Sequence, residues 1–124
     1  MLGDIEVMAT VAAKNLSASR KFYEGKLGFK FVHTEGDQAV TYQSGKSQLL
    51  VYQSQFAGTN RATAATWMVK DVEGLVKDLK AKGVSFEHYD LPGLTLKGDV
   101  HVAGPHKNAW FKDLDGNILA LIGQ

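Results

Sequence analysis

The segment NLSASRKFYEGKLGF, residues 15–29, has the features of a helix with a marked start and a marked end. Asn15 is a favourable N-cap residue, and Gly28 suits the turn that ends a helix. Between them, apolar residues recur at nearly helical spacing from Leu16 to Leu27, which predicts one apolar face. Strands are predicted around this helix at residues 6–13, 29–34, 38–44 and 47–54.

The same pattern returns in the second half, after residues 55–62, which have no clean period and are interpreted as a linker. Asp71 stands where Asn15 stands, and Gly83 stands where Gly28 stands, so the two halves form an internal repeat. The second half is predicted to contain a strand at 63–69, a helix from 71 to 82, a strand at 84–89, a loop at 90–99, and strands at 106–113 and 117–123.

Each half is therefore predicted to be one β-α-β-β-β module, and the fold class is α+β. Residues 1–54 are interpreted as module one and residues 63–124 as module two of a single domain, 1–124. A module of this size buries too little apolar surface to be stable alone. The two modules must pack together or pair with modules of a second chain.

Composition excludes several classes of partner. The formal net charge is +1, and lysines mostly have acids nearby, which argues against binding to nucleic acid or to an anionic membrane surface. The chain has no cysteine, so disulfides and thiolate metal sites are excluded. No signal-peptide pattern and no apolar stretch of about 20 residues is found, and the cytoplasm is the expected compartment.

Two segments resemble the motifs of a known family. NLSASRKFYEGKLGF and AWFKDLDGNILAL, residues 109–121, are similar to motifs of the vicinal oxygen chelate superfamily, with Leu114 in place of the usual proline. That family includes glyoxalase I, bleomycin and fosfomycin resistance proteins, and extradiol dioxygenases. The resemblance covers nearly the whole chain. It implies two tandem modules that form a curved mixed-sheet cup with the helices outside, and it implies a homodimer.

In the resembled family, four side chains on the first and last strands of the modules, usually His and Glu, bind one divalent metal. The resemblance places these positions at Met8, Leu50 (or its same-face neighbours Gln48 and Tyr52), Ala64 and Ala120. Thioether, methyl and isobutyl groups do not hold a hard divalent ion. The sequence therefore predicts an apolar cup with no metal and no other cofactor. A displaced metal site at His101 or His106 is a weaker alternative.

Aromatic side chains are the best candidates to line this cup. Strand alternation places Trp110 and Lys112 on one face, and the alanines of the cup leave room beside Trp110. Trp67 falls on the opposite face, in the core that packs against the helices. Asp113 and Asp115 are interpreted as turn residues, and loop 90–99 as a possible lid. The candidate ligand-binding residues are Met8, Leu50, Tyr52, Ala64, Met68, Trp110, Lys112, Ala120, His101 and His106.

The favoured function is a metal-free small-molecule-binding protein whose ligand is apolar or aromatic. A second hypothesis is a lyase or dioxygenase with a relocated metal or none, for which His101, His106 and Lys112 are the only titratable groups near the cup. A third is a structural or partner-binding domain with a filled cup. No catalytic residue is assigned.

Overall fold

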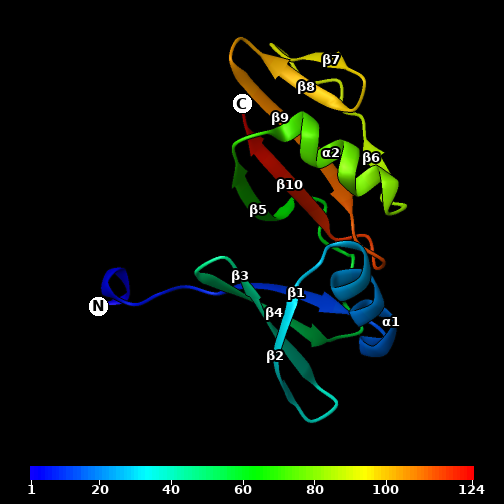
Figure 1. Cartoon of the computed structure of the whole chain (residues 1–124). Helices are drawn as coiled ribbons and strands as arrows, with labels where there is room; N and C mark the ends of the chain where they lie inside the picture. Colours follow the sequence, from blue (N-terminus) through cyan, green and yellow to red (C-terminus); the bar gives the residue numbers. More distant parts are fainter.

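The computed structural model describes all 124 residues and shows an α+β fold with two β-sheets and two main helices outside them (Figure 1). The predicted fold class is confirmed. Module one contains β1 (Ala9–Ala13), α1 (Leu16–Arg20) with a π-helical continuation (Lys21–Lys26), β2 (Lys30–Glu35), β3 (Ala39–Ser44) and β4 (Ser47–Gln53). Module two contains β5 (Thr63–Val69), α2 (Val72–Ala81), β6 (Phe86–Glu87), β7 (Thr95–Lys97), β8 (Val100–Ala103), β9 (His106–Lys112) and β10 (Ile118–Gly123). None of these helices is long and apolar enough to cross a membrane.

Both helices begin as the repeat predicts. The Oδ1 atom of Asn15 accepts a hydrogen bond from the backbone N–H of Ala18 at 3.0 Å. The Oδ1 atom of Asp71 accepts one from the N–H of Gly74, also at 3.0 Å. Each cap satisfies one of the N–H groups that a helix start leaves without a partner. The equivalent caps confirm that the two halves repeat one local design.

The first helix differs from an ordinary α-helix after Arg20. The next turn widens, and the N–H of Leu27 donates to the carbonyl of Phe22 at 3.1 Å, which is a π-helical bond. Gly28 follows with a φ of 76°, as expected for a residue that ends a helix. The sequence pattern predicts the helical segment but carries no signal for the wider turn.

The sheet of module one has the strand order β1-β4-β3-β2, with β1 parallel to β4. Val11 in β1 and Val51 in β4 are buried on the side of α1. Thr10 pairs with Leu50 one position earlier, so these two residues lie on the opposite face. We call this opposite face, in each module, the open face.

The first strand is shorter than predicted. The sequence predicts a strand at 6–13, but β1 begins at Ala9, which pairs with Leu49. Residues 1–7 run outward from β1 (Figure 1) and contain a short 3-10 helix at Leu2–Asp4, and Val7 is 90% exposed. The apolar pattern of this segment is that of a strand, but no strand of the same chain lies beside it.

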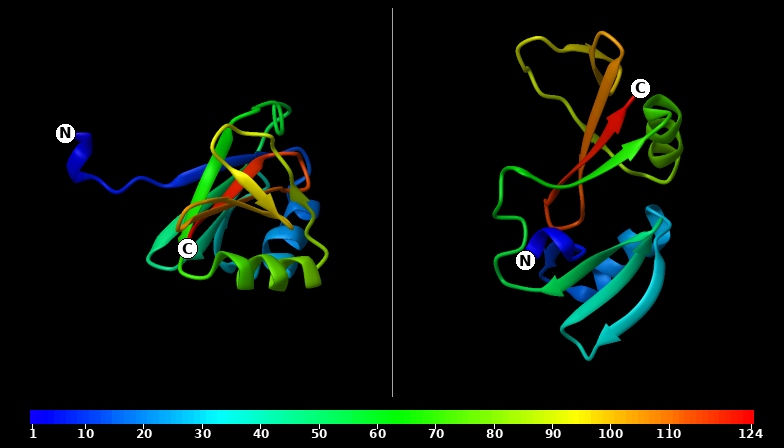
Figure 2. Two further views of the ribbon diagram at one scale, coloured as in Figure 1. Left: turned by 90° about the horizontal axis from the view of Figure 1, so that it is seen from above. Right: turned by 90° about the vertical axis from the view of Figure 1, so that its left-hand side faces the viewer.

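Module two also departs from the predicted element order. Its sheet has the order β5-β10-β9-β8-β7, and β6 also pairs with β9. The predicted strand 84–89 is reduced to β6, because β8 occupies the rest of that edge of β9. The predicted loop 90–99 contains β7, which forms a hairpin with β8. Figure 2 shows α2 on the outer side of these strands. Module two therefore has five strands after its helix rather than three.

The two modules share one hydrophobic core on their helix sides. A cluster of 19 buried residues includes Val11 and Tyr42 from module one and Phe111 and Leu121 from module two. Trp67 packs against this cluster, as the strand alternation predicts.

Two contacts of Trp67 reach into module one. Its ring lies 5.7 Å from that of Phe29, between ring centroids, and its Nε1–H donates to the hydroxyl of Ser44 at 3.0 Å. Trp67 is therefore a residue of the interface between the modules.

A buried polar network also joins the modules at Asp113. Its carboxylate accepts hydrogen bonds from the Tyr23 hydroxyl at 2.6 Å, from the Asn117 side-chain amide at 2.8 Å, and from two backbone N–H groups. Asn117 in turn donates to the carbonyl of Ala12 at 2.7 Å. The DLDGN segment forms a turn, as predicted, and in addition it connects β9 and β10 to both β1 and the first helix.

The linker docks on the same turn. The N–H of Gly58 donates to the Oδ1 atom of Asn117 at 3.3 Å, and Gly58 has a φ of +75°. The carbonyl oxygen of Asp115 occupies the place where a side-chain Cβ on residue 58 would lie. Glycine is therefore required here both for its backbone conformation and for the close approach of two chain segments.

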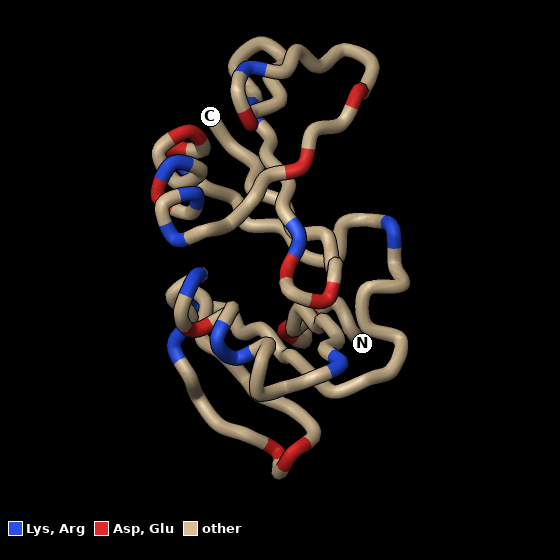
Figure 3. Tube along the Cα trace, turned by 90° about the vertical axis from the view of Figure 1, so that its right-hand side faces the viewer, with Lys and Arg blue, Asp and Glu red and all other residues tan.

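Charges are distributed over both modules. Figure 3 shows Lys and Arg interspersed with Asp and Glu along the chain trace. This arrangement agrees with the formal net charge of +1 and shows no long segment of one sign.

Candidate functional site

The open face of module two carries Trp110 at its centre. In the β-ladders, Ala120 pairs with Trp110 on one side and with Thr66 on the other. His101 pairs with Asn108, two residues before Trp110, so His101 shares this face. Neighbouring strands therefore bring His101 and Trp110 together, although the chain separates them by nine positions.

Tyr89, His101 and Trp110 form an aromatic cluster. The ring centroids of His101 and Trp110 are 4.9 Å apart, and those of Tyr89 and Trp110 are 5.4 Å apart, both in edge-to-face geometry. The backbone N–H of Tyr89 donates to the Nε2 atom of His101 at 2.9 Å. Because Nε2 accepts, the neutral imidazole carries its proton on Nδ1. The cluster thus fixes the His101 tautomer as well as the position of Trp110.

Two buried polar atoms in this cluster have no hydrogen-bond partner. They are the Nδ1 atom of His101, a residue with no exposed surface, and the hydroxyl oxygen of Tyr89. Burial, and next the charge of Glu87, raise the pKa of Tyr89, so its hydroxyl keeps its proton. Buried polar groups without a hydrogen-bond partner are uncommon in folded proteins.

A pocket of about 290 Å³ opens beside Trp110 and Tyr89. Its wall is mostly apolar, and it combines a strand residue at the centre of the face with residues from the linker and from the loop after β6. Small-molecule sites are typically concave and apolar with a few polar groups, and this pocket is at the lower end of their size range. The lining residues are Arg61, Ala62, Thr63, Tyr89, Leu91, Trp110 and Ile118.

Asp99 holds the segment that carries Tyr89. It lies at the β7–β8 turn and accepts hydrogen bonds from the Lys80 ammonium of α2 and from the His88 ring, at 2.8 Å for the latter. The bond from Lys80, and then that from His88, lower the pKa of Asp99 below its ordinary value of 3.8. Because His88 directly precedes Tyr89, this cluster fixes one end of the pocket wall.

We expect this cluster to stabilise the fold in a pH-dependent way. A carboxyl group whose pKa is lowered by folding stabilises the folded state above its unfolded pKa, and it loses that effect as the pH falls through the folded pKa. The Asp99→Asn variant should therefore be less stable than wild type at pH 7. The difference in free energy of unfolding should narrow below a pH of about 4. Urea unfolding at several pH values measures this difference in free energy. Asp78→Asn, which changes an exposed carboxylate, is the control. If the difference in free energy of unfolding between wild type and Asp99→Asn were the same at pH 7 and pH 3, the stabilising role of the Asp99 carboxylate would be contradicted.

The candidate residues on module two are not all placed alike. Ala120 is buried beside Trp110, and Met68 is 76% exposed at the end of β5. Ala64 lies at a register shift between β5 and β10 and packs against the core. Lys112 is exposed, and its ammonium pairs with Glu87 at 3.3 Å. The space beside Trp110 therefore opens toward Ile118 and Thr63 rather than toward the alanines.

Of the candidate residues on module one, only Met8 lines a hollow. Leu50 is half-buried on the open face, and Tyr52 is 41% exposed. Met8 lines a hollow of about 460 Å³ with Gln43 and Gln48. Neither of these two hollows draws residues from both modules. The two modules contact each other through β1 and β5 and through the shared hydrophobic core.

The residues at the implied metal positions do not fit a metal. Met8, Leu50, Ala64 and Ala120 offer no nitrogen or charged oxygen ligand. No group of three or more His, Asp or Glu side chains is arranged to hold an ion elsewhere, and His106 is exposed in the β8–β9 region. The side chains at these four positions therefore do not form a binding site for a divalent ion.

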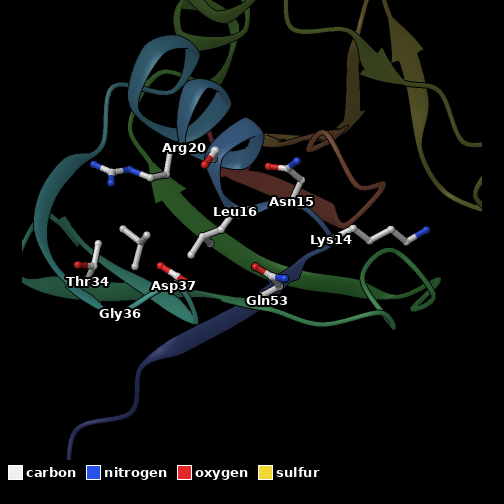
Figure 4. Close-up of a pocket in the computed structure, with 10 residues that line it drawn as sticks. Lys14, Asn15, Leu16, Arg20, Thr34, Gly36, Asp37 and Gln53 are labelled. Atoms are coloured by element: carbon white, nitrogen blue, oxygen red, sulfur yellow. The ribbon is translucent and has the colours of Figure 1, made fainter.

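A polar hollow of about 340 Å³ in module one is a less suitable site (Figure 4). Arg20 and Lys14 line it together with Asp37, so its charges are mixed. Arg20 already donates to Glu24 at 2.7 Å and stacks over the ring of Phe31. None of the buried orphaned polar atoms lies in its lining.

Of the seven residues that line the Trp110 pocket, sequence reasoning named only Trp110 as a candidate. Tyr89 and Leu91 come from the segment after β6, Arg61 and Ala62 from the linker, Thr63 from the start of β5, and Ile118 from the start of β10. Strand alternation shows which face Trp110 occupies but not which connecting segments fold beside it. Leu91, from the predicted loop 90–99, lies in the wall of this pocket, and the interpretation of that loop as a lid stays a prediction.

Comparison with known proteins gives a consistent result for the fold. The family sequence model described as Glyoxalase/Bleomycin resistance protein/Dioxygenase superfamily matches residues 6–121 of this chain. No curated protein matches significantly.

Three solved structures illustrate the similarity. A glyoxalase family protein from Enterococcus faecalis has 22% identity and a TM-score of 0.71, over 95% of this chain and 97% of that one. A genomically encoded fosfomycin resistance protein from Listeria monocytogenes has 12% identity and a TM-score of 0.71, over 96% and 92%. TnmS3, an antibiotic binding protein from Streptomyces sp. CB03234, has 16% identity and a TM-score of 0.67, over 96% of both chains. At these low identities, the TM-scores show a shared fold and no more.

Proposed function

Because the chain belongs to the glyoxalase/bleomycin resistance protein/dioxygenase superfamily, we propose that it is a metal-free protein that binds a small apolar or aromatic molecule. The observation that carries the proposal is the apolar pocket beside Trp110, with orphaned polar atoms in the adjoining aromatic cluster. An edge-to-face aromatic cluster gives a rigid surface against which a ligand ring can pack. The similarity in fold to a protein described as antibiotic binding supports the same class of function.

Two other functions have less support. A filled, purely structural cup would leave no space beside Trp110, whereas the pocket there has about 290 Å³. A lyase or dioxygenase would need a reactive group at the pocket, but Lys112 is paired with Glu87 and His101 does not line the wall. The binding function is therefore the one that the site supports best.

Binding of a neutral aromatic probe tests this proposal. Isothermal titration with 1-naphthamide should show saturable binding to the wild-type protein. The Trp110→Ala variant should bind at least about tenfold more weakly, because it removes the central aromatic wall. Phe56→Ala is the control, since Phe56 is an exposed aromatic residue that does not line this pocket, and this variant should bind like wild type.

Circular dichroism of each variant establishes that it is folded. The Trp110→Phe variant keeps an aromatic ring and should therefore lose less affinity for the probe than Trp110→Ala. Absence of wild-type binding, or equal binding by Trp110→Ala, would overturn the proposal.

The proposal includes a homodimer, as the sequence resemblance implies, and retains the cytoplasm as the expected compartment. Exposed apolar residues such as Met68 on the open face, and Ile5 and Val7 in the outward segment, support a covered surface in the working protein. Native mass spectrometry of the purified protein reports subunit number and bound metal together. We expect a metal-free dimer. A monomer, or one divalent ion per chain, would contradict this part of the proposal.

A further inference from the structure

The polar side chains in the wall of the Trp110 pocket can all donate hydrogen bonds. Arg61 and Thr63 are exposed at its mouth, and their side chains make no hydrogen bond or ion pair within the chain. The indole N–H of Trp110 also has no partner in the chain, whereas the unpaired Tyr89 hydroxyl is buried and is not one of the exposed donors. None of the lining side chains is a carboxylate or an amide.

The acids near the pocket do not neutralise Arg61. Asp90 lies between Tyr89 and Leu91 in sequence, but it is not part of the wall and forms no ion pair with Arg61. Glu87 pairs with Lys112 at 3.3 Å. Arg61 is therefore the single formal charge in the lining.

A molecule that fills this pocket must supply what the wall lacks. The apolar residues Leu91 and Ile118, together with the Trp110 ring, favour a hydrophobic or aromatic body. The unpaired donors favour oxygen acceptors at its outer end. A guanidinium presents its donors in a planar fork that matches a carboxylate, so an anionic group is the best partner for Arg61.

We propose that the ligand of this pocket is an aromatic or apolar anion, a carboxylate in its simplest form, whose ring packs on Trp110 and whose charged oxygens bind Arg61. This inference rests on the proposed binding function and adds the chemical class of the ligand. A cationic ligand is disfavoured, because it would place like charge beside Arg61 and leave the donors without acceptors.

Three naphthalene probes of nearly one shape test the charge preference: 1-naphthoate, neutral 1-naphthamide and cationic 1-naphthylmethylammonium. Isothermal titration of the wild-type protein should show the anion binding about five- to tenfold more tightly than the amide, as expected for a charge-assisted pair near the surface. The cation should bind most weakly. Raising the salt concentration should reduce the preference for the anion, because the pair is exposed to solvent.

The Arg61→Gln variant should bring the affinities for anion and amide to about the same value, without weakening the amide itself. Arg61→Lys, which keeps the charge but not the fork, should retain part of the preference. Lys77→Gln, which removes an exposed charge on α2, is the control and should behave like wild type.

The outcomes separate the two proposals. Equal affinity of the wild-type protein for anion and amide, with Trp110 still required, would overturn the anion inference and leave the binding function standing. If the Arg61→Gln variant still preferred the anion over the amide, the proposed role of Arg61 in binding the charged oxygens would also be overturned. Failure of all three probes to bind would overturn both proposals.

Discussion

The Asp113→Ala variant is expected to lose about 3–5 kcal/mol of unfolding free energy in urea titrations. The Asp113 carboxylate is 7% exposed and accepts four hydrogen bonds, from Tyr23, from the side chain and backbone of Asn117, and from the backbone of Asp115. Truncation leaves these donors buried without an acceptor. Leaving a buried donor unpaired costs about 1–3 kcal/mol, which makes this one of the largest single-site losses available in the chain.

Two comparison variants isolate the network. Tyr23→Phe removes one donor and should cost about 1–2 kcal/mol. Burial beside Asp113 raises the pKa of Tyr23, so its hydroxyl stays protonated and donates throughout the physiological range. The exposed Asp78→Ala should change stability by less than about 0.5 kcal/mol. If Asp113→Ala lost no more than Asp78→Ala, the network would not be what joins the modules.

The Gly58→Ala variant is expected to lose about 3 kcal/mol or more in the same measurement. Two costs add at this position. An alanine at a φ of +75° is strained, and its Cβ would collide with the carbonyl oxygen of Asp115, which is backbone and cannot rotate away. The linker would have to leave the turn, and the hydrogen bond from the Gly58 N–H to Asn117 would be lost.

Gly93→Ala separates the two costs. Gly93 has a φ of +80°, close to that of Gly58, but a Cβ added there meets nothing within 4 Å. This variant therefore carries only the conformational penalty, about 1 kcal/mol. Equal losses in the two variants would show that the close approach of linker and turn does not contribute.

Local sequence signals were sufficient for most of the fold. Asn15 and Asp71 act as caps because their side chains bond to the backbone within three residues, which a sequence pattern can predict. The hairpin of β7 and β8 was missed because three residues, Thr95–Lys97, are too few to show alternation. Their strand conformation comes from the ladder with β8. The π-helical turn after Arg20 likewise has no period of its own.

The candidate site was predictable only in part. Alternation and the Ala120 position predicted that Trp110 lies on the open face, and the register agrees. The wall supplied by Arg61 and Tyr89 depends on how a linker and a loop fold beside that face, and this depends on long-range contacts such as the bond from Tyr89 to His101.

The residues that line the pocket are largely different from those that stabilise the fold, and this has an evolutionary consequence. Arg61 and Leu91 line the pocket, but neither takes part in the Asp113 network or in the buried hydrophobic cluster. Substitutions at these positions can alter ligand preference while leaving the module interface intact. Such a chain can diverge toward new ligands by small steps, each of which starts from a stable protein.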